Sequence, residues 1–408
     1  MFAHLAQLKK RYSWIWRSGL PFVTARYPTA LERLRVFGLK AELRGRRPVT
    51  RVVGWWLLLL CWPVASLSYA ITASRKDRAE AGASAWGKFC SYYGAALTHN
   101  ARPGELQWLG MQAGVAPDMA PQLLFNRDSR IWQALNRLNG ADGDDVQDKA
   151  RFFQLCERAN LRAVPVYAAF ARGESLLPID RKAASGRSLF VKSLRGQQGE
   201  GAAIWRWATH SAGEGYSDGT TIHPTLDELL TDLARTDCVV QPLLSDHALL
   251  RAAGSEGLSS LRIVTARIPD GQVRAVCALL LMSKGMLSQF GESFGIDIRD
   301  GSLTTWLDTR ADTPRRRSQL PDGFALPNIP GWSGLIEMVC HAHAAGFPAF
   351  STLGWDIVLT DDGPFLLEAN QGWGIMLHQV LGEPMGHTAL GAAAEAWLDD
   401  LARRKALT

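Results

Sequence analysis

The chain has 408 residues, 47% of them hydrophobic, which is enough for two or more domains with substantial cores. Its net charge of +6 is uneven, because residues 1–51 carry twelve Lys and Arg against two Glu, a net +10 that leaves −4 for the remainder. The basic charge therefore belongs to the N-terminus, and we expect no nucleic-acid binding by the rest of the chain. Six scattered cysteines without a CxxC pair indicate free thiols in a reducing compartment, and no structural zinc.

An uncharged run of 21 residues, 52–72, follows the basic segment. It is long enough to span a membrane, but Pro63 divides it and three tryptophans, which favour membrane interfaces, lie inside it. We therefore expect residues 1–79 to form a basic, helical region whose apolar helix or hairpin lies on an anionic membrane surface. A true span and a buried core helix are the alternatives.

Residues 80–145 are expected to be a mixture of helix and loop, with an amphipathic helix at 131–138. A helix led by acidic residues follows from Asp144 and turns Phe152, Phe153 and Cys156 to one face. Short strands are then predicted at 163–167, 188–192 and 238–244.

A candidate phosphate-binding loop follows the strand that ends in Lys192. Three glycines come after it, Gly196, Gly199 and Gly201. Glycines allow a tight turn whose N–H groups can face an anion. The loop lacks the GK[ST] ending of a P-loop, and an ordinary hairpin loop is the alternative.

Two hairpins are predicted in the second half of the chain. Strands 261–267 and 273–282 flank a Pro-Asp-Gly turn, and Arg262 points away from Ile263. Strands 355–359 and 365–367 flank an Asp-Asp-Gly-Pro turn. The second hairpin would bring Asp356 next to Glu368, and Asn370 would share the face of Glu368 because alternate strand residues point the same way. Two carboxylates and an amide oxygen suit Mg²⁺ and phosphate, although acids also end ordinary strands.

The order of these parts resembles the ATP-grasp superfamily, most closely its sugar-transfer-associated, α-L-glutamate ligase-like branch. The resemblance covers residues 144–385. The matching parts are Asp148-Lys149, Val191-Lys192 with the glycine loop, the apolar hinge at 239–244, the RIVT run at 262–265, and Asp356 with Glu368-Ala369-Asn370. It implies an α+β fold in which two subdomains, 146–242 and 243–408, grip ATP.

The resemblance also implies a role for each matching residue. Lys149 and Lys192 would contact the nucleotide phosphates under the loop of Gly196, Gly199 and Gly201. Backbone groups at Gln241, Pro242 and Leu243 would bind adenine. Asp246 would serve the ribose, unless it caps a turn. Asp356, Glu368 and Asn370 would hold Mg²⁺, and Arg262 would steady the γ-phosphate.

The implied activity is an ATP- and Mg²⁺-dependent carboxylate–amine ligation through an acyl phosphate, in cell-surface polysaccharide or envelope biosynthesis. Because ATP is cytosolic, we expect the protein in the cytoplasm, on the inner face of the membrane. A kinase that phosphorylates a sugar or another hydroxyl is the first alternative and would need a general base, for which His247 and Asp297 are the candidates. A membrane-tethered nucleotide-binding subunit of a glycan-assembly complex is the second. The sequence indicates neither the acceptor nor the oligomeric state.

Overall fold

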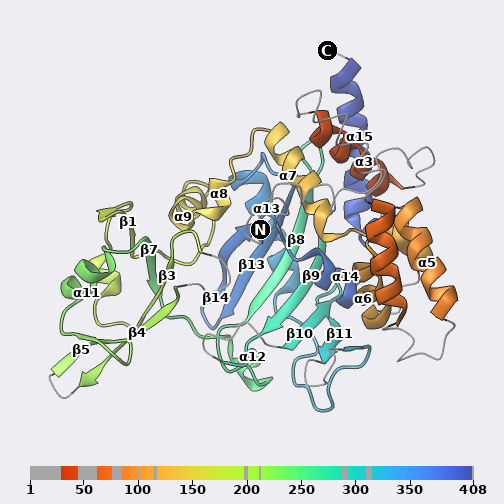
Figure 1. Ribbon diagram of the computed structural model, residues 1–408. Helices are drawn as coiled ribbons and strands as arrows, with labels where there is room; N and C mark the ends of the chain where they lie inside the picture. Colours follow the sequence, from red (N-terminus) through yellow and green to blue (C-terminus); the bar gives the residue numbers. More distant parts are fainter. Residues whose placement is uncertain are drawn as a thin grey trace, which may run out of the picture.

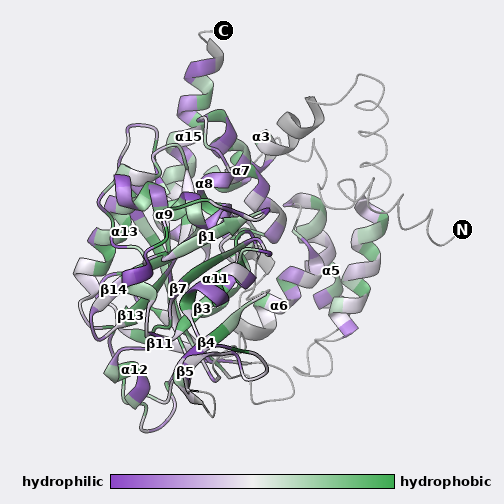
Figure 2. Ribbon diagram, turned by 90° about the vertical axis from the view of Figure 1, so that its left-hand side faces the viewer, coloured by the Kyte–Doolittle hydropathy of each residue, from purple (hydrophilic) through white to green (hydrophobic). Residues whose placement is uncertain are grey.

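The computed structural model describes residues 29–44, 62–75, 85–99, 101–113, 117–196, 201–210, 213–285, 292–308 and 315–406. In these ranges the chain forms two seven-stranded antiparallel sheets surrounded by helices (Figure 1). The strands of both sheets are rich in hydrophobic residues (Figure 2). The predicted α+β fold is therefore confirmed.

The first sheet has the strand order β2-β1-β7-β3-β4-β5-β6. Its strands are β1 (Ala168–Ala171), β2 (Glu174–Ser175), β3 (Leu189–Ser193), β4 (Ala203–His210), β5 (Gly213–Ser217), β6 (Ile222–His223) and β7 (Cys238–Pro242). The helices of this part are α8 (Asp144–Gln147), α9 (Lys149–Arg158), α10 (Arg181–Ala184) and α11 (Leu226–Leu233). We call this part the first lobe.

The second sheet has the order β12-β11-β10-β9-β8-β13-β14. Its strands are β8 (Ser260–Arg267), β9 (Val273–Met282), β10 (Glu292–Ile296), β11 (Leu303–Asp308), β12 (Arg315–Arg317), β13 (Thr352–Thr360) and β14 (Gly363–Asn370). Helix α13 (Trp332–Gly346) packs on one face, while α14 (Ile375–Leu381) and α15 (Ala389–Ala406) pack on the other. The short α12 (Ala248–Ala252) precedes β8. We call this part the second lobe.

Helices from the N-terminal part cover the same side of the second lobe as α14 and α15. They are α3 (Ala30–Arg44), the helix of residues 62–75, α5 (Ala85–Thr98), α6 (Pro103–Ala113) and α7 (Ser129–Leu138). In α3, Leu31 and Leu34 share a hydrophobic cluster with Trp132 of α7 and Trp397 of α15. Within the predicted N-terminal region, α3 therefore belongs to the core beside the second lobe.

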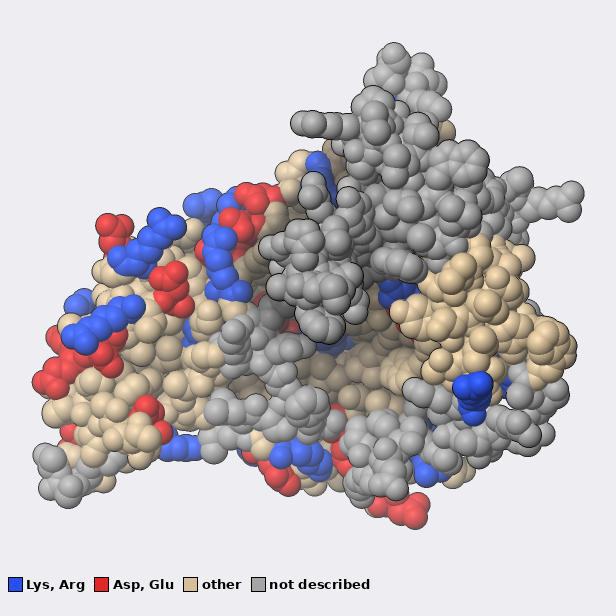
Figure 3. All heavy atoms as spheres, viewed as in Figure 1, with Lys and Arg blue, Asp and Glu red and all other residues tan. Residues whose placement is uncertain are grey.

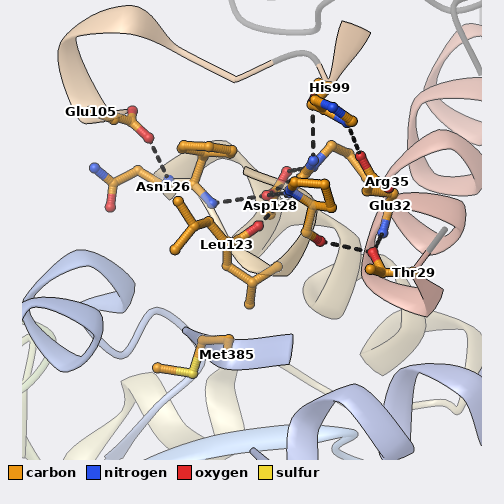
Figure 4. Close-up of polar contacts among 12 residues, drawn as sticks. Thr29, Glu32, Arg35, His99, Glu105, Leu123, Asn126, Asp128 and Met385 are labelled. Carbon is orange, nitrogen blue, oxygen red and sulfur yellow. Dashed lines mark hydrogen bonds and ion pairs between the residues drawn. The ribbon is translucent and has the colours of Figure 1, made fainter. Parts of the chain in front are cut away.

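A buried polar network fixes α3 in this position (Figure 4). The Nε of Arg35 donates to both carboxylate oxygens of Asp128, over 3.1 and 3.0 Å. Its Nη2 donates to the Leu123 carbonyl over 2.6 Å. Glu32, fully buried, lies 2.6 Å from Nδ1 of His99. Some of the N-terminal charge is thus neutralised inside the protein.

Two sequence-based boundaries were wrong. The strand predicted at 163–167 begins only at Ala168, and Ala163 makes just an isolated bridge to Leu366. Pro165 lacks an N–H and so interrupts a ladder there. The single helix expected from Asp144 is split into α8 and α9, because Asp148 adopts an extended conformation and caps α9.

The apolar run 52–72 is described only from residue 62, and residues 52–61 lie outside the described part. Residues 62–75 form one helix. Within the described ranges, no helix combines the length and apolarity needed to cross a bilayer.

Candidate active site

A β-bulge in the hairpin of β13 and β14 aligns the two acidic residues. From the turn inward, the strands pair regularly as far as Ile357 with Leu366, and the next pair is Asp356 with Glu368. Leu367 is therefore an extra residue without a partner across the hairpin. The predicted juxtaposition of Asp356 and Glu368 is present, but it depends on this bulge.

The bulge also decides which side chains of β14 face the site. Leu366 and Ala369 both lie in the hydrophobic core although they are three residues apart. Strict alternation from Leu366 would have pointed Glu368 into that core as well. Because the bulge changes the alternation, Glu368 and Asn370 instead share the opposite face with Asp356.

Arg262 of β8 forms a two-pronged ion pair with Asp356 of the neighbouring strand. Its Nε donates to Oδ1 over 2.6 Å, and its Nη2 donates to Oδ2 over 2.7 Å. The Asn370 amide nitrogen donates to Oδ2 of Asp356 over 3.4 Å and to Oε1 of Glu368 over 3.2 Å. The predicted arginine and the three predicted metal ligands therefore form one hydrogen-bonded group.

Two lysines of the first lobe face this group. Lys192 lies on β3 and is only 8% exposed. Lys149 begins α9, and its Nζ donates to the Gly196 carbonyl over 2.9 Å. The charge of Glu368 acts on both lysines. Residues that are far apart in the sequence thus meet between the two sheets.

Burial lowers the pKa of both lysines. Burial lowers the pKa of Lys192 to about 8, and the nearby charge of Lys149 lowers it further against the opposing effect of Glu368. Burial also lowers the pKa of Lys149. Partly desolvated ammonium groups bind anions strongly because little water screens them.

The two carboxylates are affected in opposite directions. Burial raises the pKa of Asp356 to about 6, even against the charge of Arg262. Burial would also raise the pKa of Glu368, but the charge of Lys192 and the hydrogen bond from Asn370 outweigh it, so this pKa lies below its usual value. Glu368 is thus the more firmly ionised of the pair.

The glycine loop joins β3 to β4 as a hairpin connection. Gly196 and Gly201 lie at its two ends, and Gly201 has a φ of +68°, a conformation that favours glycine. Gly199 lies outside the described residues. The loop begins next to both site lysines, as a phosphate-binding role requires.

An ion-pair network that the sequence interpretation missed anchors this loop. Arg195 donates to both carboxylate oxygens of Asp144, each over 3.1 Å, and to Asp148 over 3.2 Å. Asp148 also accepts from the backbone of Ala150 and so caps α9 directly before Lys149. Asp148 and Arg195 are therefore positioning residues for the lysine and the loop.

The hinge residues use their polar groups within the protein. The side chain of Gln241 donates to the Val164 carbonyl over 3.4 Å, and Pro242 closes β7. The Leu243 amide donates to the Ser188 carbonyl over 3.1 Å. That bond must be shared or broken if the Leu243 amide is to bind adenine, so adenine recognition here stays a prediction.

Asp246 is 1% exposed and stabilises a turn. The Ser259 amide donates to its Oδ1 over 2.8 Å, and the Ser255 hydroxyl donates to its Oδ2 over 2.5 Å. This is the capped turn considered as the alternative, and contact with a ribose stays a prediction.

His378 is a further site residue that the sequence gave no means of finding, since a lone histidine carries no spacing signal. A side-chain carbon on Gly374 would lie 3.8 Å from Arg262, and residue 378 follows one helical turn later on the same face of α14. Its imidazole is 1% exposed, neither nitrogen makes a hydrogen bond of ordinary geometry among the described residues, and the backbone of Trp373 acts on the ring. The centroid of the imidazole lies 5.8 Å from that of the Trp373 ring, and the two rings meet edge to face.

The donor set fits Mg²⁺, because Asp356, Glu368 and the Asn370 amide offer hard oxygens. Across the described ranges, no group of three or more His, Cys, Asp and Glu gathers as a metal cluster. Arg262 holds both oxygens of Asp356, and Asn370 presents its nitrogen. Metal binding therefore requires Arg262 to release an oxygen and the amide to turn over.

Two antiparallel sheets, with the lysines of one facing the acidic hairpin of the other, are the arrangement of an ATP-grasp protein. The family described as sugar-transfer associated ATP-grasp matches residues 136–389, and the chain belongs to this family. The resemblance seen in the sequence is thereby confirmed.

Several solved structures are similar at low identity. An L-amino acid ligase from Bacillus licheniformis is 14% identical over 66% of this chain and 54% of that chain, with a TM-score of 0.33. A D-alanine–D-alanine ligase from Bacillus anthracis complexed with ATP is 14% identical over 62% and 60%, with a TM-score of 0.29. An N5-carboxyaminoimidazole synthetase from Staphylococcus aureus complexed with ADP is 13% identical over 58% and 52%, with a TM-score of 0.31. The chain spans about half the length of the first of these structures. No curated protein matches it.

Proposed function

We propose that the protein is an ATP- and Mg²⁺-dependent ligase that joins a carboxylate to an amine through an acyl phosphate. The observation that carries this proposal is the meeting of three cations with two carboxylates and an amide between the lobes. The cations are Lys149, Lys192 and Arg262. Phosphoryl transfer needs positioning and charge neutralisation, and it needs little covalent help from the protein.

Each residue has a distinct task in this proposal. Lys149 and Lys192 hold the phosphates of ATP, and Asp148 and Arg195 keep Lys149 and the loop in place. Asp356, Glu368 and Asn370 hold Mg²⁺, which when bound neutralises phosphate charge.

Arg262 changes partner during the reaction. It would turn from Asp356 toward the transferring phosphoryl group, which would leave the Asp356 carboxylate free to hold Mg²⁺.

The reaction has two steps. An oxygen of the substrate carboxylate attacks the γ-phosphorus, the bond to ADP breaks, and an acyl phosphate forms. A neutral amine then attacks the acyl carbon, phosphate leaves, and the amine proton passes to solvent or to a nearby base. Arg262 stabilises the charge that develops on the phosphoryl oxygens and then on the leaving phosphate.

A kinase is the second candidate, because the same group of cations and carboxylates could direct the phosphoryl group to a hydroxyl instead of a carboxylate. The two bases suggested by the sequence are engaged elsewhere. His247 accepts from the Leu249 amide and caps α12, and Asp297 is held by Arg299. Burial lowers the pKa of His378 to about 3, so this imidazole is neutral but is a weak base, and at 1% exposure it gives the kinase no better general base.

A nucleotide-binding subunit without catalysis is less well supported. Such a protein would be expected to have lost a metal ligand, and Asp356, Glu368 and Asn370 are all present. The family description supports a role alongside sugar transfer in envelope polysaccharide synthesis. Together with the basic N-terminus, it supports a location on the cytoplasmic face of the membrane.

The test is to incubate the protein with Mg-ATP and a metabolite extract and to analyse all products. Release of ADP and inorganic phosphate with a new amide supports the ligase. Release of ADP with a new phosphate ester and no inorganic phosphate supports the kinase. Nucleotide binding without any turnover supports the binding subunit and contradicts both enzymes.

A further inference from the structure

Apart from the buried Trp62, the helix of residues 62–75 packs with its small side chains inward and its large apolar side chains outward. Ala70 and Ala73 are 0% and 2% exposed. On the outer face, Val64 is 66% exposed and Tyr69 is 60% exposed, and Leu67 and Ile71 are 39% and 37% exposed. A helix at a water-facing surface normally shows the reverse arrangement.

Specific contacts fix this orientation. The Trp62 indole donates to the Ala96 carbonyl of α5 over 2.9 Å. Ala70 and Ala73 lie in one hydrophobic cluster with Tyr92 and Ala95, so small residues let the two helices approach closely. Rotating the helix to bury its large side chains would break the indole bond and separate this seam.

The charged residues of this helix and of α5 are all positive. Residues 62–75 and 85–98 include Arg75 and Lys88 but no Asp or Glu. Figure 3 shows this side of the molecule, over α5 and its neighbouring helix, as a broad surface almost without charged side chains. Trp86, at the start of α5, is 72% exposed. Exposed aromatic and aliphatic side chains bordered by cations suit an anionic bilayer.

The neighbouring sequence has the same character. The uncharged run begins at residue 52, ten residues before the described helix, and the 51 residues before it carry a net +10. A protein partner would need only an apolar surface, whereas this combination of apolar run and basic flank matches a lipid surface of negative charge.

We propose that Val64, Leu67, Tyr69 and Ile71, which we call the outward face, insert into the interface of an anionic lipid bilayer, with Trp86 beside them. This deepens the membrane location in the proposed function by naming the side chains that make the contact. It does not depend on whether the site is a ligase or a kinase.

The contact would also orient the catalytic lobe. Ala70 and Ala73 share their hydrophobic cluster with Leu279 of β9 and with Met376 and Leu381 of α14. Helix α14 carries His378 and follows the hairpin of β13 and β14, on which the proposed metal ligands lie. The helix of residues 62–75 and α14 are therefore parts of one packed unit, which would hold the site at a fixed orientation above the bilayer.

The test uses the full-length chain and flotation with vesicles of phosphatidylcholine, alone or mixed with phosphatidylglycerol. We expect binding to the mixed vesicles, which falls at high salt. The triple variant Val64→Ser, Leu67→Ser, Ile71→Ser should lose at least about tenfold in bound fraction, because each lost apolar side chain weakens insertion.

A matched control replaces three exposed apolar residues elsewhere, Leu138→Ser, Leu176→Ser and Ile222→Ser, whose exposed fractions are 56%, 41% and 45%. The control should float like the wild type. Equal flotation of the triple variant and the control would overturn the proposal. So would a wild type that forms dimers without lipid while the triple variant is a monomer, since a second copy would then cover the outward face.

Nucleotide binding, measured with a fluorescent ATP analogue, separates this proposal from the previous one. Loss of flotation with intact nucleotide binding supports the outward face whatever the reaction proves to be. If the triple variant does not fold, the single variants Val64→Ser and Tyr69→Ser, at the two most exposed positions, replace it and should each lower the bound fraction.

Discussion

The guanidinium of Arg262 holds both oxygens of Asp356, at 2.6 and 2.7 Å, on the face of the sheet where a metal ligand is expected. The arginine neutralises a carboxylate that is buried between the lobes. In the proposed reaction the same arginine must serve the phosphoryl group. If Asp356 holds Mg²⁺ as proposed, Arg262 and Mg²⁺ would compete for it before nucleotide binds.

This competition gives an unusual expectation for Arg262→Ala. Turnover of ATP should fall by about 10²- to 10³-fold, because a preorganised cation is lost from the transition state. Binding of Mn²⁺ without nucleotide should become tighter than in the wild type, since no guanidinium has to be displaced. Electron paramagnetic resonance of free Mn²⁺ measures this affinity. Weaker Mn²⁺ binding in the variant would show that Arg262 helps to build the metal site.

Replacement of Glu368 by glutamine tests the metal ligands. Glu368→Gln removes one negative charge, so Mg²⁺-dependent ATP turnover should fall by about 100-fold or more while the fold stays intact. ADP release across a Mg²⁺ titration is the measurement. Glu337→Gln, an exposed position on α13, is the matched control and should leave turnover unchanged. Unchanged turnover in Glu368→Gln would disprove the site assignment.

His378 should make the protein sensitive to acid. Its pKa in the folded state, about 3, lies below the value of 6.5 for an exposed imidazole. Between these two pKa values the imidazole of the unfolded chain binds a proton, while that of the folded chain does not. The stability of the folded state with respect to this group is therefore complete above about pH 6.5 and is lost as the pH falls toward about 3. Between about pH 7 and about pH 5 this loss amounts to about 2 kcal/mol of unfolding free energy.

The variant His378→Leu should remove that component. Its urea midpoint should fall less than that of the wild type between neutral pH and about pH 5. At neutral pH it should be at least as stable, because a buried polar imidazole that makes no hydrogen bond of ordinary geometry is replaced by an apolar side chain. Equal acid sensitivity of the two proteins would contradict the buried, neutral state of His378.

The buried pair of Arg35 and Asp128 provides a stability prediction. Arg35→Met leaves the Asp128 carboxylate buried without its main cation and should cost about 3–5 kcal/mol of unfolding free energy. Arg33→Met, on the same helix, breaks only the exposed contact to Glu395 at 3.5 Å and should cost less than about 1 kcal/mol. Thermal unfolding of the two variants makes the comparison. Similar midpoints would mean that α3 contributes little to the core.

The sequence allowed most of the site to be predicted because its parts lie on local hairpins. Asp356, Glu368 and Asn370 belong to one hairpin, and Lys192 ends a short apolar strand before a glycine loop. Alternation and turn residues are enough to recognise such elements.

Other features depend on contacts between distant residues and could not be read from patterns. The basic N-terminus was predicted as a region of its own, and the patterns gave no sign that its Arg35 is paired with the buried Asp128. The side chain of Gln241 turns to Val164 because the chain between them folds back. His378 could not be recognised from the sequence, because only the fold brings it near Arg262. Neighbouring elements decide which face of a helix is buried, and a single sequence does not show which elements are neighbours.

The unpaired Leu367 has a consequence for how related proteins can be recognised. A chain without this residue would pair Asp356 with the same glutamate in a regular ladder, and its two carboxylates would simply be one position closer in sequence. The three-dimensional arrangement would be retained while the interval between the acids changed. Any search that fixes this interval would separate proteins whose metal ligands are the same, so the interval has to be treated as variable.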